Sequence, residues 1–408
     1  MQEKQSGSRR RDAYYGILLL GIVSLMGDIV YEGSRGLVPS YLEFLGATAV
    51  VVGLVGGLGD FLGYSVRLVT GFLSDSTRAY WFFIFLGYGL VGAIPLLGVP
   101  LGIEIAIVLV LLERFGKAIR SPSRDTVLSV ISKDVGAGKA FGIHEFLDQM
   151  GAISGPLIVA FLMLVTANYN TTFILLLIPF FGLMIALAIT YRKTRAKTVP
   201  AEARRIGGKR EKLTGPFYIY SLAVLLNTVG LVPASLILFK VSGILPSAEQ
   251  WLVPLVYFVI QAVDAPVALI AGYTYDRIGI IILVLPFTLS VLPPLLTMFG
   301  TGLTVLMLAA AFYGLVLGMQ ESIYRAAVSG LTDVSSRGTA YGVFNTAYGF
   351  GYLLSGAVYG LLIDFKVPFA GVIPYVLATQ IVAIALLLRI RPRLREQRQA
   401  LNARSKPQ

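Results

Sequence analysis

Long apolar stretches of roughly 18–25 residues alternate along this chain with short polar segments. A helix needs about 20 apolar residues to cross a ~30 Å hydrocarbon core, so each stretch is long enough to span a membrane. Strands of a membrane barrel are about half as long and alternate in polarity, which these stretches do not. The pattern therefore predicts an all-α polytopic membrane protein with twelve spans. They lie near residues 15–36, 48–72, 80–99, 102–124, 140–165, 170–191, 215–240, 250–272, 279–299, 302–327, 338–362 and 369–389.

The second six spans repeat the first six at an offset of about 200 residues. We therefore expect two pseudo-symmetric six-helix bundles, residues 1–191 and 215–389, joined by a basic linker at 192–214 and followed by a basic tail at 390–408. Two parallel halves are typical of transporters, because the cleft between them can open to either side in turn. The repeated positions are Gly71–Asp75 and Gly272–Asp276, Arg124 and Arg325, Val127 and Val328, Ala140 and Ala340, Gly142 and Gly342, and Gly151 and Gly351.

The charge distribution indicates how the chain is oriented in the membrane. Of its 408 residues, 56% are hydrophobic and 14% are charged, well below the ~25% of soluble domains. The net charge of +12 is compatible with nucleic-acid binding, but the N-terminal tail, the 192–212 linker and the 389–408 tail hold 20 of the 34 Lys and Arg. This positive-inside bias predicts a multi-pass protein of the cell (inner or plasma) membrane, with both termini and the linker in the cytoplasm. It argues against a nucleic-acid partner.

The residue inventory argues against enzyme and cofactor chemistry. The chain has no cysteine and one histidine, so thiolate metal sites and a zinc cluster are excluded. No Ser-His-Asp set, H-E-x-x-H motif or phosphate-binding G-x-x-x-x-G-K-[ST] loop is present. We therefore expect neither an enzyme nor an ATP-driven pump, and no cofactor or metal.

The loop between the second and third spans carries a recognisable motif. Gly71-Phe72-Leu73-Ser74-Asp75-Ser76-Thr77-Arg78 resembles the signature of the major facilitator superfamily at this position, although its usual basic run is reduced to Arg78. With the twelve-span, two-half plan, the resemblance covers essentially the whole chain. It implies a secondary active transporter that works by alternating access, and a fold for which a monomer suffices.

Two further motifs bear on the branch of that family. Arg114 lies where the family often carries an arginine in span four, and the surrounding E-R-x-G-K-x-I-R-x-P-x-R-D resembles an archaeal and bacterial branch with no settled substrate. Many drug exporters place Gln and Gly after that arginine, where this chain has Lys117 and Ala118. In span five, a partial glycine and proline spacing resembles drug/proton antiporters and implies efflux by antiport. Its matching residues are Gly142, Gly151, Gly155 and Pro156.

Ionisable residues inside the predicted spans indicate a polar cavity. A charge near mid-bilayer costs about 2.5–3.5 kcal/mol on insertion scales, so clustered charges need partners and water. Asp28, Glu32 and Arg35 follow i, i+4, i+7 and share one face of span one. An acid beside an arginine at the midplane can act as a proton switch. Burial raises the pKa of a carboxyl group and a neighbouring arginine lowers it, so a rearrangement of the helices changes whether the acid is protonated. The predicted coupling residues are Asp28 facing Arg114, with Asp60 or Glu113 as second acid and Asp148 as a relay.

The other candidate residues divide into a substrate site and a cytoplasmic gate. Arg120 and Arg124 are expected to pair with Asp75 or Asp125 and latch the inner gate, and Asp276 with Arg325 forms the same latch in the second half. For the tyrosines of the second half, helix packing is the competing interpretation. The predicted substrate-binding residues are Glu32, Arg35, Lys117, Asn227, Gln261, Asp264, Asn345, Tyr348 and Tyr352. The predicted gate residues are Gly71, Asp75, Arg78, Arg120, Arg124, Asp276 and Arg325.

These patterns favour a proton-coupled secondary transporter that exports a small organic or amphiphilic solute by antiport. Its expected partners are that small molecule, protons and the lipid bilayer. The main alternative is movement of an organic anion or phosphate ester, with Arg114 and Lys117 as counter-charges. A receptor, or a lipid scramblase on the same scaffold, remains open as a different class. The sequence does not name the substrate or the stoichiometry.

Overall fold

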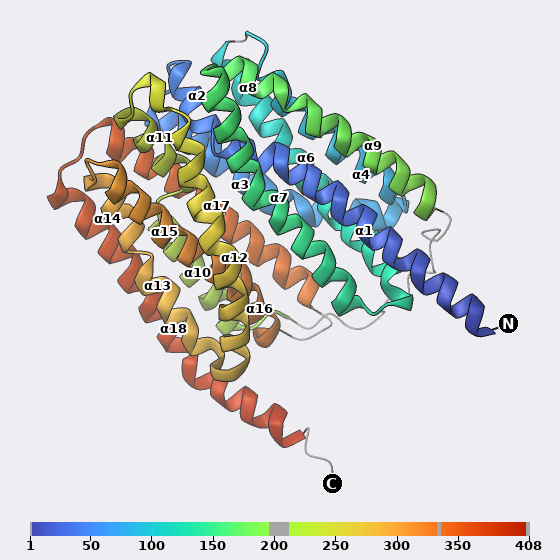
Figure 1. The fold of residues 1–408 in the computed structure, drawn as a ribbon. Coiled ribbons are helices and arrows are strands. Elements are labelled where there is room, and N and C mark those ends of the chain that lie inside the picture. The colour runs from blue at the N-terminus through green and yellow to red at the C-terminus, as the bar shows by residue number, and fades with distance from the viewer. Residues whose placement is uncertain (1, 101, 196–211, 333–335, 405–408) are drawn as a thin grey trace. The chain divides into compact units, whose positions relative to one another are not determined.

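The computed structural model describes residues 2–100, 102–195, 212–332 and 336–404, and these form helices without a strand (Figure 1). Most of the predicted 192–214 linker lies outside the described residues. The helices are α1 (Gln2–Arg35), α2 (Val38–Phe44), α3 (Ala49–Thr77), α4 (Tyr80–Gly89), α5 (Ala93–Leu96), α6 (Ile103–Ile131), α7 (Ala137–Thr166), α8 (Tyr169–Leu175), α9 (Leu177–Thr194), α10 (Gly215–Val229), α11 (Ala234–Ile244), α12 (Leu252–Ile278), α13 (Val284–Leu289), α14 (Leu292–Phe299), α15 (Leu303–Met319), α16 (Arg325–Leu331), α17 (Arg337–Asp364) and α18 (Phe369–Arg404).

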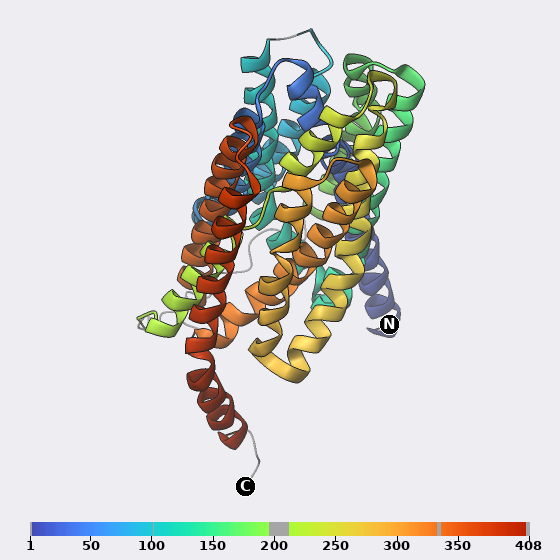
Figure 2. The same cartoon turned by 90° about the vertical axis from the view of Figure 1, so that its left-hand side faces the viewer.

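The prediction of an all-helical, multi-pass membrane fold is confirmed. Ten helical stretches of the described chain are long and apolar enough to cross a membrane. The stretch Tyr80–Leu96 is apolar but shorter, and α6 has 29 residues but carries several charges. Together these segments follow the order of the twelve predicted spans. Figure 2 shows α18 as one long helix that leads to the C-terminus.

The chain divides into two compact units. Unit 1 comprises Met1–Ala47, Leu62–Arg205 and Leu245–Phe258, and unit 2 comprises Thr48–Phe61, Ile206–Ile244 and Val259–Gln408. Unit 1 contains most of the predicted first half of the chain, and unit 2 contains most of the second half. Each unit also includes one segment of the other half: the beginning of α12 belongs to unit 1, and the beginning of α3 belongs to unit 2. The two segments occupy equivalent positions in the repeat.

In unit 2, the beginning of α3 packs closely against α17. A Cβ placed on Gly53 would lie 2.2 Å from the Gly356 carbonyl oxygen, so only glycine allows this approach. At the ends of the same two helices, the Asp364 carboxylate accepts hydrogen bonds from the Ala49 and Val50 backbone N–H groups at 2.9 and 3.0 Å. Small residues allow two membrane helices to pack closely. The carboxylate provides the hydrogen-bond acceptors that the first N–H groups of a helix lack.

In unit 1, α6 contains Pro122 within its helical length. Proline has no N–H, so the Ala118 carbonyl one turn earlier loses its helical donor. The Thr70 hydroxyl of α3 donates to that carbonyl at 3.1 Å. Backbone groups freed inside a membrane must find such partners, so Thr70 and Pro122 together fix the second half of α3 on α6.

Candidate functional site

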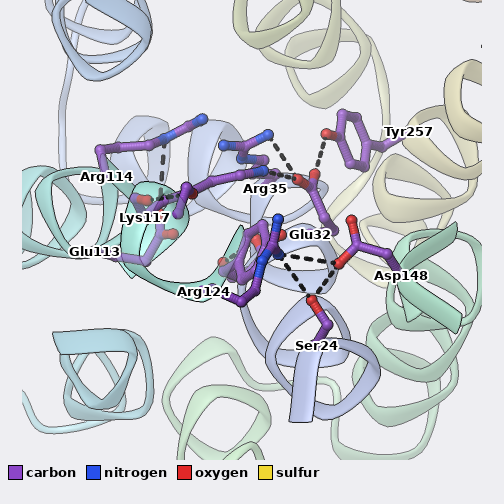
Figure 3. Close-up of polar contacts among 12 residues, drawn as sticks. Ser24, Glu32, Arg35, Glu113, Arg114, Lys117, Arg124, Asp148 and Tyr257 are labelled. Carbon is purple, nitrogen blue, oxygen red and sulfur yellow. Dashed lines mark hydrogen bonds and ion pairs between the residues drawn. The ribbon is translucent and has the colours of Figure 1, made fainter. Parts of the chain in front are cut away.

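Glu32 is the centre of a buried polar cluster in unit 1, shown in Figure 3. Its Oε1 accepts from Arg35 Nη1 at 2.8 Å and from Lys117 Nζ at 3.1 Å. Its Oε2 accepts from the Tyr257 hydroxyl at 2.6 Å. Only 4% of Glu32 is exposed. The carboxylate is therefore held by two cations and a phenol from three different helices, α1, α6 and α12.

Local packing explains why α12 reaches this cluster. A Cβ on Gly36 would lie 3.0 Å from Pro254 Cα and 3.3 Å from Tyr257 Cβ, so the missing side chain lets the beginning of α12 lie against the end of α1. On α1 itself, the helical period places Asp28, Glu32 and Arg35 on one face, as predicted. The site is thus assembled from one acidic helix face and two approaching helices.

A second group of charges surrounds Arg124 of α6. Its Nη2 lies 3.0 Å from Asp125 Oδ1, and its Nη1 lies 3.1 Å from the Ser24 hydroxyl and 3.7 Å from Asp148 Oδ1. Ser24 in turn donates to Asp148. His144 is buried within electrostatic reach of this group, and its Nε2 has no hydrogen-bond partner among the described residues. Ser24 is a member that the sequence did not single out.

Asp28 lies between these two groups. It is 2% exposed, and its electrostatic neighbours include Asp148, Lys117 and Glu32. Its Oδ1 accepts no hydrogen bond within the described part of the chain. A buried carboxylate is costly to leave ionised unless charged or hydrogen-bonding groups compensate it, so Asp28 stays the candidate for the predicted coupling role.

The predicted partner of Asp28 was Arg114, and that pairing stays a prediction. In the structure, the Arg114 Nε lies 3.7 Å from Glu113 Oε2, and Glu113 is 1% exposed. Lys117 forms an ion pair with Glu32 at 3.1 Å, and its charge also acts electrostatically on Asp28. Asp60 lies on α3 in the segment assigned to unit 2, so its predicted part in the coupling also stays a prediction.

Arg120 does not make its predicted ion pair with Asp75 or Asp125 among the described residues. Its guanidinium carbon instead lies 4.8 Å from the Tyr31 ring centre and 4.6 Å from the Tyr88 ring centre. The ring of Tyr31 also faces Lys117 Nζ at 4.4 Å. Neither tyrosine was a sequence candidate, because a tyrosine within an apolar span gives no sign of a cation stacked on it.

The remaining gate candidates lie within the last two turns of their helical stretches or directly after them. Gly71 packs on Pro122, Asp75 accepts from the Tyr80 hydroxyl at 3.1 Å, and Arg78 has a positive φ of 56° directly after α3. In unit 2, Asp276 lies near the end of α12 and Arg325 begins α16. The gate roles stay predictions.

Unit 2 contains a buried network of neutral amide and tyrosine side chains. The Asn227 amide nitrogen donates to Gln380 Oε1 at 2.7 Å, and its oxygen accepts from the Tyr324 hydroxyl at 2.7 Å. Tyr348 and Tyr352 both donate to Gln320 Oε1, at 2.9 and 3.0 Å. Gln320, Tyr324 and Gln380 share this network with the predicted substrate-binding residues Asn227, Tyr348 and Tyr352, and the sequence did not single them out.

A wide helical turn places this network. Gln320–Tyr324 is π-helical, a form often found at functional sites. The Tyr220 hydroxyl donates to the Tyr324 carbonyl at 2.9 Å and so satisfies a backbone group within the wide turn. Among the other predicted substrate-binding residues of unit 2, Gln261 and Asp264 are buried on α12 and Asn345 lies on α17.

Comparison with known proteins places the chain among membrane transporters. The family model of the Major Facilitator Superfamily matches residues 17–355 and 255–407. The uncharacterized protein Rv2265 of Mycobacterium tuberculosis is 34% identical over 388 residues, which cover 93% of this chain and 93% of that protein. The uncharacterized MFS-type transporter MJ1317 of Methanocaldococcus jannaschii is 26% identical, over 88% of this chain and 91% of that protein.

Solved transporter structures share the fold. The nucleoside transporter NupG aligns with a TM-score of 0.69 at 15% identity, over 91% of this chain and 98% of NupG. A bacterial homolog to the human lysosomal transporter Spinster aligns with a TM-score of 0.63 at 12% identity, over 97% of this chain and 99% of that one. Identities this low are evidence for the fold alone.

Proposed function

Since this chain belongs to the major facilitator superfamily of membrane transporters, we propose that it is a proton-coupled secondary transporter that exports a small organic or amphiphilic solute by antiport. The observation that carries the proposal is the position of Asp28. Its buried carboxylate lies one helical turn from Glu32, and Lys117, which forms an ion pair with Glu32 at 3.1 Å, also acts electrostatically on Asp28. When two acids interact with the same cation, protonation of one changes the charge balance at the other.

Protonation of Asp28 removes one of the charges that attract Lys117. The lysine then pairs with Glu32 alone, and Glu32 keeps its full set of partners, including the Tyr257 hydroxyl. Loss of the proton draws Lys117 toward Asp28 and weakens the hold on Glu32. Because Tyr257 belongs to α12, which continues into unit 2, the charge on α1 biases the position of α12. Transport is coupled when solute and proton favour different positions.

Direction and topology rest on the sequence. The glycine and proline spacing of span five resembles antiporters and favours export. The basic linker and termini favour a cytoplasmic location for both ends in the cell membrane. The neutral Asn227–Gln320 network of unit 2 favours a solute pocket shaped by amides and phenols.

The proposal is tested with purified protein in proteoliposomes that contain a pH dye. Organic cations, organic anions, sugars and lysolipids are offered in turn, and proton movement is followed for wild type and Asp28→Asn. The matched control is Glu104→Gln, which neutralises an exposed acid in the first turn of α6. A solute that moves protons in wild type and the control, but not in Asp28→Asn, supports the coupling. Flux that is independent of protons in all three proteins would indicate a uniporter, and lipid movement without a gradient would indicate a scramblase.

The organic-anion alternative is weaker in its original form. Lys117 is paired with Glu32, and Arg114 with Glu113, so both proposed counter-charges already face carboxylates. If an anion such as a phosphate ester is the solute, its charge needs a different cation.

A further inference from the structure

Arg120 is a buried cation that no carboxylate of the described residues contacts. Its side chain is 2% exposed, and its Nε and Nη1 make no hydrogen bond. The neighbouring basic residues differ from it, because each has an acidic partner within 4 Å. These neighbours are Arg35 and Lys117 on Glu32, Arg114 on Glu113, and Arg124 on Asp125.

Stacking on aromatic rings satisfies only part of this side chain. The Tyr31 and Tyr88 rings stabilise the charge of the guanidinium through their π-systems. The N–H donors point outward in the guanidinium plane, where a ring face offers them no lone pair. Leaving such donors buried and unpaired is costly. The Nε and Nη1 N–H groups at the edge of the Arg120 guanidinium therefore lack a hydrogen-bond acceptor among the described residues.

The packing that produces this geometry is specific to two helices. A Cβ on Gly87 of α4 would lie 2.5 Å from Arg120 Cβ, so glycine at that position lets the base of the arginine sit against α4. Tyr88 follows directly, and its ring covers the guanidinium. Gly116, one turn before Arg120, makes the same close approach to the Gly87 carbonyl. Arg120 is thus held in a fixed position and cannot simply extend into water.

Two further buried donors in unit 1 are also unpaired. The Tyr88 hydroxyl and the Ser123 hydroxyl are buried, and neither has a hydrogen-bond partner among the described residues. Tyr88 provides one of the rings stacked on Arg120, and Ser123 lies about one helical turn after Arg120 in the sequence of α6. A guanidinium edge and hydroxyl groups are donors that suit oxygen atoms carrying negative charge.

We propose that unit 1 binds one small oxyanion, a carboxylate or a phosphate, at the edge of the Arg120 guanidinium, with the Tyr88 and Ser123 hydroxyls as further donors. The planar guanidinium favours these groups over a spherical ion because it donates to two oxygens at once. The oxyanion is either free in solution or the charged group of the transported solute. Binding here needs no proton gradient, so this proposal stands apart from the coupling at Asp28.

The test is equilibrium binding of labelled acetate and of labelled inorganic phosphate to the protein in lipid nanodiscs, in a sulfonate buffer at constant ionic strength. Wild type is expected to bind one anion per chain. Arg120→Gln is expected to lose this binding, and Arg120→Lys to weaken it, because an ammonium cannot donate to two oxygens in one plane. The matched control is Arg277→Gln, which removes an exposed arginine stacked 4.4 Å from the Tyr273 ring centre and should bind like wild type.

Two milder variants keep the test decisive if Arg120→Gln does not fold. Tyr88→Phe and Ser123→Ala retain the packing and remove only hydroxyls that lack partners, so each is expected to fold and to weaken binding about 5- to 10-fold. Unchanged affinity in both, or no binding of either anion to wild type, overturns the proposal.

A second arm separates the two sources of the anion. Proteoliposomes loaded with the labelled anion are diluted into buffer with and without the unlabelled one. Exchange by wild type that Arg120→Gln lacks identifies the anion as the charged group of the solute. Stoichiometric binding without exchange identifies an anion that stays in the protein. Anion binding is also measured for Asp28→Asn. If this variant loses proton coupling but still binds the anion, the two sites act independently, and failure of one proposal does not imply failure of the other.

Discussion

The Tyr257 hydroxyl lies 2.6 Å from Glu32 Oε2, although the two residues are 225 positions apart in the chain. This bond ties the beginning of α12 to the acidic face of α1 within unit 1. Glu32 is therefore hydrogen-bonded to α12, and the part of α12 from Val259 onward belongs to unit 2.

Tyr257→Phe is expected to destabilise the protein and slow transport. A hydrogen bond to a charged group contributes about 1.5–3 kcal/mol, and its loss also releases α12 from Glu32. The measurements are the free energy of unfolding in mixed micelles and the initial rate of solute flux. Tyr359→Phe is the matched control, because its buried hydroxyl donates to the neutral Gly230 carbonyl at 2.6 Å. It should lose only about 0.5–1.5 kcal/mol, and equal losses in both variants would contradict the special role of Tyr257.

Glu32 and Lys117 are expected to be energetically coupled. Their side chains are 5% and 24% exposed and lie 3.1 Å apart, so removing one leaves the other poorly compensated. In a double-mutant cycle of Glu32→Gln and Lys117→Gln, the coupling should be about 0.5–3 kcal/mol, with the double variant more stable than the sum of the single losses implies. Purely additive effects would show that the contact is of no consequence for stability.

The Asp364 carboxylate is expected to stabilise the first turn of α3. Asp364→Ala removes both acceptors of the Ala49 and Val50 N–H groups and should cost about 0.5–2 kcal/mol. Asp364→Asn keeps one acceptor and should cost less. Hydrogen exchange at the Ala49 and Val50 amides reports the change directly, and protection that survives in Asp364→Ala would refute the cap.

Gly53→Ala is expected to force α3 and α17 of unit 2 apart. The new methyl group would lie 2.2 Å from the Gly356 carbonyl oxygen, and overpacking of this kind costs about 1–3 kcal/mol. Gly63→Ala on the same helix is the control, because no atom lies within 4 Å of its Cβ position. The control should be neutral or gain up to about 1 kcal/mol from helix propensity. Thermal unfolding of both variants is the measurement, and equal midpoints would argue against close packing at Gly53.

The helices could be predicted from the sequence because they depend on short-range periodicity. Span length and apolar composition predicted an all-helical membrane protein, and the structure confirms it. The division into two six-helix bundles and the site roles of Asp28, Glu32 and Arg35 stay predictions. The inference on the fold succeeds because it depends on residues within a few helical turns of one another.

Contacts between distant helices were beyond the sequence. Nothing in the chain indicates that Tyr257 reaches Glu32, because that depends on the missing side chain at Gly36. The stacking of Arg120 depends in the same way on Gly87, which reads as an ordinary glycine in an apolar span. The π-helical turn at Gln320–Tyr324 has no sequence signature, so the amide network around it was predicted only in part.

The role of Asp28 as carrier of the proton that drives transport is tested by two transport modes of one variant. Once a solute is identified, wild type and Asp28→Asn are compared in proteoliposomes by exchange of labelled for unlabelled solute and by accumulation driven by a pH gradient. We expect Asp28→Asn to retain exchange, because the permanently neutral side chain still permits the solute-bound movement, but to lose gradient-driven accumulation. Accumulation by Asp28→Asn at the wild-type level would show that Asp28 does not carry the proton.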